Sequence, residues 1–186
     1  MNLNMNPFSI PHPTRRDLLA ASLVAIFCFC AGSSAAAGEF HGKVVGVLDG
    51  DTIDVLVERA DGGVQRRRVR LADIDAPEKG QPFGARAKAA LSTLVYSQEV
   101  RVIDRGSDRY GRTLGLVMGV TGEANEAMVR DGLAWVYRRY SSRADLLAAE
   151  AVAREERRGL WSLPSPTPPW QWRHDRAGTA VLDAPR

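Results

Sequence analysis

The sequence predicts an α+β fold in which three strands, a helix, two further strands and two more helices follow one another along the chain. The prediction depends on three features: β-branched runs separated by Gly and Asp turns, an apolar stripe at helical spacing, and the absence of cysteine after residue 30. The 149 residues from 38 to 186 are enough to form a core without disulfides. A five-stranded barrel with a helix between its third and fourth strands is the OB-fold arrangement.

Residues 1–37 are typical of an export signal rather than of a folded domain. A polar stretch with Arg15 and Arg16 is followed by an apolar run over residues 18–32 and by small residues up to Ala37. The apolar run has 15 residues, whereas a bilayer span requires roughly 20. A cleaved signal peptide is therefore predicted, with an uncleaved N-terminal anchor as the alternative. The mature domain is expected in the periplasm or outside the cell.

The route of export stays open. The segment from Thr14 to Leu19 also fits a twin-arginine signal, but a pair of arginines is common in the charged part of any signal peptide. Cys28 and Cys30 lie in the apolar run and would be removed with it. The mature chain would then contain no cysteine, which excludes disulfides and cysteine-based metal sites.

Three strands joined by short turns are predicted at the start of the mature chain. They cover Phe40–Leu48, Thr52–Val57 and Val64–Leu71. The turn Asp49-Gly50-Asp51 separates the first two, and Ala60-Asp61-Gly62-Gly63 forms a hairpin turn between the second and the third. In the third strand Arg66, Arg68 and Arg70 share one face, which is basic, while Val69 and Leu71 share the other.

A helix over Pro82–Tyr96 is predicted by an apolar stripe at positions i, i+3, i+4, i+7 and i+8, formed by Ala87, Ala90, Leu91, Leu94 and Val95. Strands at Glu99–Asp104 and Arg112–Val120 follow it. Helices at Asn125–Arg130 and Ala144–Arg158 complete a domain that extends over residues 38–163.

The segment 164–186 is predicted to be an extended strap and tail without helix. Four prolines precede Trp170, and proline disfavours both helices and central strands. Trp170 and Trp172 are expected to pack on the domain, and Trp161 is assigned a similar structural role because large aromatic side chains dominate burial. Disorder is expected beyond Asp175.

Four carboxylates lie beside predicted turns, namely those of Asp49, Asp51, Asp75 and Glu78. Two strand ends of a small barrel can lie side by side, which would allow Asp51 and Asp75 to share one cation. Oxygen ligands without cysteine favour Ca²⁺ or Mg²⁺ over zinc. Taken alone, an Asp-Gly-Asp sequence is usually turn chemistry, so the metal interpretation depends on the whole set.

The number and position of the arginines are a second indication of function. Of the 25 Lys and Arg residues, two precede residue 38, and 20 of the remaining 23 are arginine. Arginine binds phosphate through paired hydrogen bonds and keeps its charge. Arg70 lies on a strand five residues before Asp75, and Arg112 follows the turn Asp108–Gly111. Each would be an ordinary surface arginine if it stood alone.

Several motifs together resemble the staphylococcal nuclease (thermonuclease) family. They occur in the family's order as Asp49-Gly50-Asp51-Thr52, Arg70–Glu78, Asp108–Arg112, Asn125–Ala134 and Gly159-Leu160-Trp161. The resemblance covers about residues 40–163. It implies a five-stranded OB-fold barrel with about three helices, which hydrolyses phosphodiester bonds with Ca²⁺.

The resemblance also implies a set of metal ligands. Asp51 and Asp75 resemble the carboxylate ligands, and the backbone carbonyl of Ala76 resembles a third ligand. Family members often have Thr in place of Ala76, but a backbone ligand does not depend on the side chain. Asp49 corresponds to a residue close to the metal and outside the ligand set.

The catalytic roles follow from the same motifs. Glu78 resembles the residue that positions or deprotonates the attacking water, and a carboxylate within reach can accept that proton. Arg70 and Arg112 resemble the two phosphate-binding arginines. Fixed guanidinium groups stabilise the negative charge that develops in phosphoryl transfer.

Arg109, Tyr110 and Tyr140 are the candidates for contact with the nucleotide. Tyr110 resembles the family tyrosine beside the phosphate, although packing on the barrel is the alternative. Tyr140 keeps the spacing of one base-contacting tyrosine, whereas Arg138 stands where the other would be. An arginine there can stack on a base or reach a phosphate, and a solvated side chain is the alternative.

Together these features and the family resemblance predict an exported, Ca²⁺-dependent nuclease that cuts DNA and RNA with little sequence specificity; the resemblance further implies that it leaves 3′-phosphates. We expect a monomer that does not associate with membranes after removal of its signal. Two other interpretations are a non-catalytic OB-fold binding module and a cell-envelope interaction protein that uses the C-terminal strap. The presence of the complete acidic and arginine set argues against the binding module.

Overall fold

The computed structural model describes residues 38–182; the predicted signal peptide over residues 1–37 lies outside this range, as do residues 183–186. Within the described range, no helix combines the length and the apolar character needed to cross a membrane. The α+β fold with a closed barrel of five long strands, predicted from the sequence, is confirmed.

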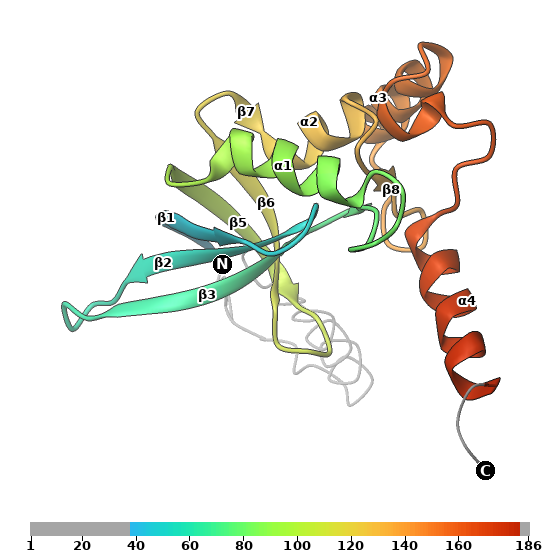
Figure 1. Cartoon of the computed structure of the whole chain (residues 1–186). Helices are drawn as coiled ribbons and strands as arrows, with labels where there is room; N and C mark the ends of the chain where they lie inside the picture. The colour runs from blue at the N-terminus through green and yellow to red at the C-terminus, as the bar shows by residue number, and fades with distance from the viewer. Residues whose placement is uncertain (1–37, 183–186) are drawn as a thin grey trace, which may run out of the picture. The chain divides into compact units, whose positions relative to one another are not determined.

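Five long strands form the barrel: β1 (Glu39–Val47), β2 (Thr52–Glu58), β3 (Val64–Leu71), β5 (Glu99–Ser107) and β6 (Thr113–Gly119). They pair in the order β3-β2-β1-β5-β6, with antiparallel neighbours. A parallel pairing of β3 with β6 then closes the barrel (Figure 1). The short strand β7 (Gly122–Glu123) extends the sheet beside β6.

The alternation of side chains along β2 and β3 builds the core. Ile53, Val55 and Val69 are fully buried, and Ile53 lies directly opposite Val69 in the strand register. Burial of each such side chain contributes about 1.5–3 kcal/mol. The next pair in the register is Thr52 with Arg70. The core packing of these two strands therefore also fixes the position of Arg70.

Three helices cover the barrel on one side. α1 (Gly84–Val95) buries its apolar stripe in the core through Ala87, Leu91 and Val95. α2 (Ala124–Arg130) contacts α1 and β6, and α3 (Ala144–Glu155) packs on α2 (Figure 1). The 3-10 helix η1 (Gly159–Ser162) follows α3.

A second, two-stranded sheet was not expected from the sequence. β4 (Ile74–Asp75) pairs antiparallel with β8 (Trp135–Val136), and Asp75 lies opposite Trp135. Each strand has only two residues, which is too short for an alternating pattern to be recognised. This pairing holds the predicted metal ligand Asp75 in extended backbone at the end of the barrel.

Helix and strand ends differ from the predicted ones by a few residues. The helix expected from Pro82 begins at Gly84, because Phe83 has a φ of 69° and is not helical. The helix expected to reach Arg158 ends at Glu155. The fourth long strand continues to Ser107 instead of ending at Asp104.

The prediction that residues 164–186 contain no helix is wrong. A fourth helix, α4, covers Pro169–Leu182. Proline is tolerated at its first position because the amides of a first turn have no partner within the helix. The disorder expected beyond Asp175 is also wrong as far as the end of this helix. The structural role expected for Trp170 is confirmed, since its ring packs edge-on against Trp135 with centroids 5.7 Å apart.

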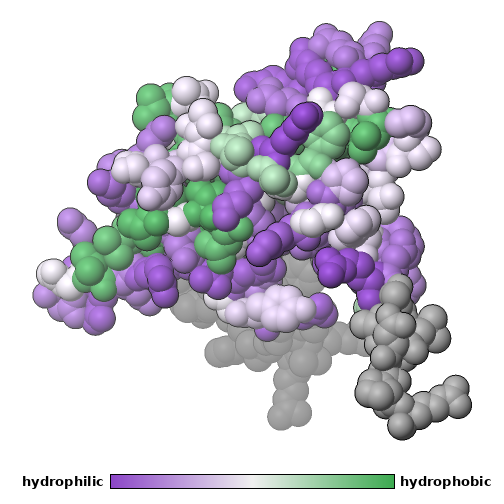
Figure 2. Space-filling model, viewed as in Figure 1, coloured by the Kyte–Doolittle hydropathy of each residue, from purple (hydrophilic) through white to green (hydrophobic). Residues whose placement is uncertain are grey.

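Most of the basic face of β3 is balanced locally. Figure 2 shows a largely hydrophilic surface with apolar residues along the β2–β3 hairpin. On this hairpin, Arg68 donates from Nε to Asp54 Oδ1 at 2.9 Å, and Arg66 Nε lies 4.0 Å from Asp54 Oδ2. Arg67, on the opposite face of the strand, lies over the ring of Phe40. Arg70, at the end of the strand, instead contacts the carboxylates of Asp51 and Asp75.

Candidate active site

The turn between β1 and β2 positions the first two acidic residues. Asp49 Oδ1 accepts a hydrogen bond from the Asp51 amide at 3.0 Å, which closes the turn. Gly50 is required at its centre, because a Cβ there would lie 2.7 Å from the Cβ atoms of both Ala76 and Ala87. The turn therefore packs directly on α1 and on the chain after β4.

Asp51 is buried, and both of its carboxylate oxygens accept hydrogen bonds. Its Oδ1 accepts from the Thr52 hydroxyl at 3.0 Å, and its Oδ2 accepts from the Ala76 amide at 3.0 Å. The Ala76 bond links the first acidic turn to the segment after β4, 25 residues along the chain. The backbone of Ala76 is thus next to the Asp51 carboxylate, as expected for residues that contribute to one site.

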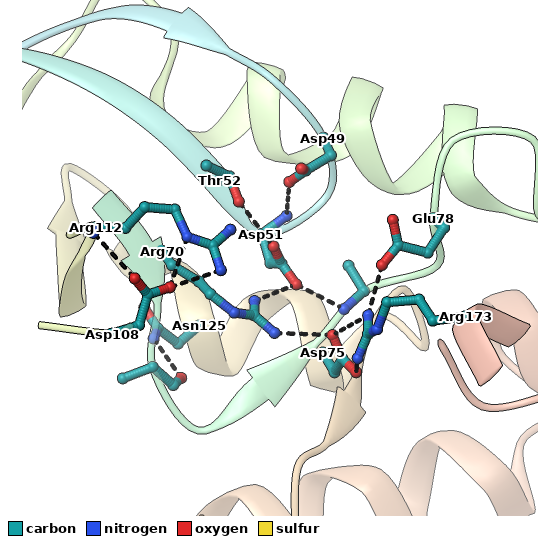
Figure 3. A network of polar contacts seen from close by, with 12 residues as sticks. Asp49, Asp51, Thr52, Arg70, Asp75, Glu78, Asp108, Arg112, Asn125 and Arg173 are labelled. Carbon is teal, nitrogen blue, oxygen red and sulfur yellow. Dashed lines mark hydrogen bonds and ion pairs between the residues drawn. The ribbon is translucent and has the colours of Figure 1, made fainter. Parts of the chain in front are cut away.

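Arg70 bridges the two predicted carboxylate ligands. Its Nη1 lies 2.5 Å from Asp51 Oδ2, and its Nη2 donates to Asp75 Oδ1 at 2.8 Å (Figure 3). The side chain of Arg70 is 12 % exposed and that of Asp75 is 1 % exposed. The structure therefore brings Asp51 and Asp75 together, with the predicted phosphate-binding arginine between them.

Burial and neighbouring charges both shift the pKa values of these groups. Burial by itself lowers the pKa of the Arg70 guanidinium, but Asp51 and Asp75 outweigh this effect and raise it. Burial raises the pKa of Asp75, and so does repulsion from Asp51, despite the arginines that contact it. Burial and the neighbouring Asp51 also raise the pKa of Asp49 to about 6. Burial therefore disfavours the negative charge of these carboxylates.

Glu78 is more exposed than Asp75. Its amide donates to Gln81 Oε1 at 3.0 Å, and Gln81 Nε2 in turn donates to the carbonyl of Thr167 at 2.7 Å. Its carboxylate accepts from Arg173 Nη1 at 2.5 Å (Figure 3). The loop that carries Glu78 is therefore tied to the C-terminal segment through both its backbone and its side chain.

Arg112 stands at the seam where β3 and β6 close the barrel. Arg70 lies opposite Leu114 in the parallel register, so Arg112, two residues earlier, is expected on the same side of the sheet. Asp108 holds Arg112 by accepting from its amide at 3.0 Å and from its Nε at 2.7 Å. Burial raises the pKa of Asp108, but these hydrogen bonds and one from the Tyr110 amide outweigh burial and leave it lowered.

The predicted nucleotide contacts are on the surface. Tyr110 is exposed, with the guanidinium of Arg109 over its ring at 4.7 Å and that of Arg112 at 5.6 Å. Tyr110 is thus beside a predicted phosphate-binding arginine. Tyr140 is also exposed and meets Tyr137 edge-on, with centroids 4.9 Å apart. Arg138 is not a freely solvated arginine, because its Nη2 donates to the buried carboxylate of Glu150 at 2.6 Å.

Three polar residues with clear roles were not assigned from the sequence. Asn125 is fully buried and accepts from the Val117 amide while donating to the carbonyls of Ala72 and Gly115. Asp108 orients Arg112. Arg173 of α4 contacts both Asp75 and Glu78. Asn125 and Asp108 lie inside recognised motifs, whereas no pattern around Arg173 indicates a contact with residues almost 100 positions away.

The fold and the site together define an OB-fold protein whose barrel end combines buried carboxylates with fixed arginines. Carboxylate and carbonyl oxygens are ligands for hard divalent cations, and arginine pairs bind phosphate groups. Such a combination suits recognition of a phosphate ester next to a metal ion.

Comparison with known proteins agrees with this class. The family model "Staphylococcal nuclease homologue" matches residues 68–163, more than half of the chain. A micrococcal nuclease from Shigella flexneri is 50 % identical over 146 residues, which cover 73 % of this chain and 81 % of the relative. Protein ParB from Escherichia coli is 45 % identical over 169 residues, 85 % of this chain and 91 % of the relative. An uncharacterized endonuclease from Haemophilus influenzae is 40 % identical over 168 residues, 90 % of this chain and 91 % of the relative.

The chain therefore belongs to the staphylococcal nuclease family. Membership of this family supports nuclease activity and nucleic acid as the substrate class.

Proposed function

We propose that this protein is an exported, Ca²⁺-dependent nuclease that hydrolyses phosphodiester bonds of DNA and RNA with little sequence specificity and leaves 3′-phosphates. The observation that carries the proposal is the bridge from Arg70 to Asp51 and Asp75, with Glu78 three residues beyond Asp75. Residues from two separate turns meet at one end of the barrel in the combination that the family's chemistry requires.

The acidic residues fit a divalent cation. No group of three or more His, Cys, Asp and Glu side chains arranged to hold a metal occurs within residues 38–182, but the proposed ligand set needs only two carboxylates. Asp51, Asp75 and the carbonyl of Ala76 would hold Ca²⁺, with water as the remaining ligands, because Ca²⁺ accepts six to eight oxygens in flexible geometry. The ion would supply positive charge next to the phosphate during hydrolysis.

Three side chains have separate roles in the hydrolysis. Arg70 and Arg112 bind the non-bridging oxygens of the phosphate and stabilise the additional negative charge of the transition state. Glu78 accepts a proton from the water that forms the new bond to phosphorus. The bond from phosphorus to the 5′ oxygen breaks, the 5′ oxygen takes a proton from solvent, and the phosphate stays on the 3′ oxygen.

The low sequence specificity follows from the kind of groups that would contact the substrate. The groups assigned to the substrate contact phosphate, and the exposed ring of Tyr110 offers a face to any base. Recognition through phosphate and stacking carries little sequence information. We further propose that the mature chain acts as a monomer in the periplasm or outside the cell, because residues 1–37 resemble an export signal.

Digestion of single- and double-stranded DNA and of RNA by residues 38–186 tests the proposal. We expect cutting with Ca²⁺, none with chelator, and products with 3′-phosphate ends. Cutting with chelator present would refute the metal dependence, and products with 5′-phosphate ends would refute the assigned bond cleavage. Tight binding of DNA by a folded protein that cuts in no metal would favour the OB-fold binding module instead.

A further inference from the structure

The C-terminal strap, which we define as residues 164–182, is built against the candidate site. Gln81, next to the loop of Glu78, donates to the carbonyl of Thr167. Trp170 stacks on Tyr137 with an interplanar angle of 4° and centroids 5.4 Å apart. Trp172 and Pro77 line a small cavity of about 70 Å³ between the strap and the domain. These contacts position the first turn of α4 beside Asp75 and Glu78.

Arg173, the fifth residue of α4, extends toward the carboxylates of the site. Its Nη2 donates to Asp75 Oδ2 at 2.7 Å, and its Nη1 donates to Asp75 Oδ1 at 3.2 Å and to Glu78 Oε1 at 2.5 Å (Figure 3). One guanidinium thus neutralises a proposed metal ligand and the proposed base at once. Together with Arg70, it leaves both oxygens of Asp75 bonded to arginine.

A divalent cation and this guanidinium require the same carboxylate. Asp75 is almost fully buried, whereas the side chain of Arg173 is 42 % exposed. Of the two partners, Arg173 is therefore the one that can move into solvent when a cation takes its place, while Asp75 cannot turn away. The neighbouring anchors Trp170 and Thr167 do not depend on Arg173, so release of its side chain leaves the rest of the strap in contact with the domain.

We propose that Arg173 is an internal cation that competes with the metal ion for Asp75 and Glu78, so that the metal-free site is closed and ion binding displaces the Arg173 side chain. The inference rests on the proposed metal dependence of the same site. It gives the C-terminal strap a function besides packing: it keeps the acidic residues paired while no metal is present.

Calorimetric titration of the mature chain with Ca²⁺ at fixed ionic strength tests this competition. Removal of the competing charge in Arg173→Gln is expected to tighten Ca²⁺ binding by about three- to tenfold, because partly exposed ion pairs are weak individually and two of them are lost. Arg173→Lys keeps the charge without the paired geometry and is expected to lie between the two. Arg176→Gln removes the same charge from an exposed position of the same helix and is expected to leave the affinity unchanged.

A second measurement follows Arg173 in the unaltered protein. The NMR signal of its side-chain Nε–Hε group, assigned by its loss in Arg173→Gln, is expected to shift on addition of Ca²⁺ toward that of a solvated arginine. Ca²⁺ binding without a shift of this signal, or with equal affinity in Arg173→Gln and the natural chain, would overturn the competition and leave the proposed nuclease function intact. Absence of Ca²⁺ binding in both chains would refute the metal dependence on which the inference rests.

Discussion

Asn125 is a buried amide that joins three parts of the chain around the site, and its removal should be costly. Its Oδ1 accepts from the Val117 amide at 3.0 Å, and its Nδ2 donates to the Ala72 carbonyl at 2.9 Å. A further bond reaches the Gly115 carbonyl at 3.1 Å, which also accepts from the Ala72 amide. In Asn125→Ala the Gly115 carbonyl keeps that second partner, whereas the Val117 amide and the Ala72 carbonyl lose the partner that Asn125 supplies.

The expected loss of stability follows from these two orphaned groups. Each buried polar group without a partner costs about 1–3 kcal/mol, so Asn125→Ala should lower the free energy of unfolding by about 4 kcal/mol. For a domain of this size that corresponds to a fall in Tm of about 8–16 °C. Urea denaturation followed by circular dichroism measures the change directly.

Thr93→Ala provides the matched control. Thr93 is exposed on α1, and its hydroxyl donates to the Ala89 carbonyl at 3.1 Å, so its loss should change stability by no more than about 0.5 kcal/mol. A loss below about 1 kcal/mol in Asn125→Ala would refute the reasoning, because it would mean that other groups satisfy the Val117 amide and the Ala72 carbonyl.

Three further predictions concern the site. Glu78→Gln and Arg112→Ala should each lower kcat by about 10²–10⁴-fold with an unchanged circular dichroism spectrum; turnover like that of the natural chain in either variant would contradict its assigned role. Asp51→Ala should weaken Ca²⁺ binding in a calorimetric titration, and an unchanged affinity would count against Asp51 as a ligand. Asp108→Asn should lose more stability relative to the natural chain at pH 7 than at pH 3. The lowered pKa of Asp108 contributes stability that is present above its unfolded pKa of about 4 and is lost as the pH falls through the folded pKa. Urea denaturation at both pH values measures this difference, and an equal difference at both would contradict the prediction.

The parts of the fold that could be predicted are those with a repeating local pattern. The bounds of β3 were predicted correctly because alternation over eight residues leaves one register that buries Val69 and Leu71. Asp51 and Asp75 were predicted to be able to share one cation, because two strand ends of a small barrel can lie side by side. In the structure both carboxylates contact Arg70, which lies between them.

The parts that could not be predicted depend on contacts between distant segments. Arg173 lies 98 residues from Asp75, and the prolines before α4 gave the wrong expectation for its backbone. Arg138 was interpreted from its own neighbourhood, whereas its partner Glu150 is a buried residue on α3. A sequence pattern describes which face of an element is apolar, and it does not indicate which distant charge approaches that element.

The two predicted phosphate-binding arginines differ in how they are built into the protein, and the difference determines what their variants can show. Arg70 is almost buried between Asp51 and Asp75, so its removal would leave two buried carboxylates close together with Arg173, on Asp75, as the remaining guanidinium between them and solvent. Breaking a buried ion pair in this way costs about 3–5 kcal/mol, and loss of activity in an Arg70 variant would combine unfolding with loss of phosphate binding. Arg112 pairs with Asp108 in a loop outside the core. Kinetic changes in Arg112 variants therefore report on the phosphate more directly, and they are the better measure of what an arginine contributes to this site.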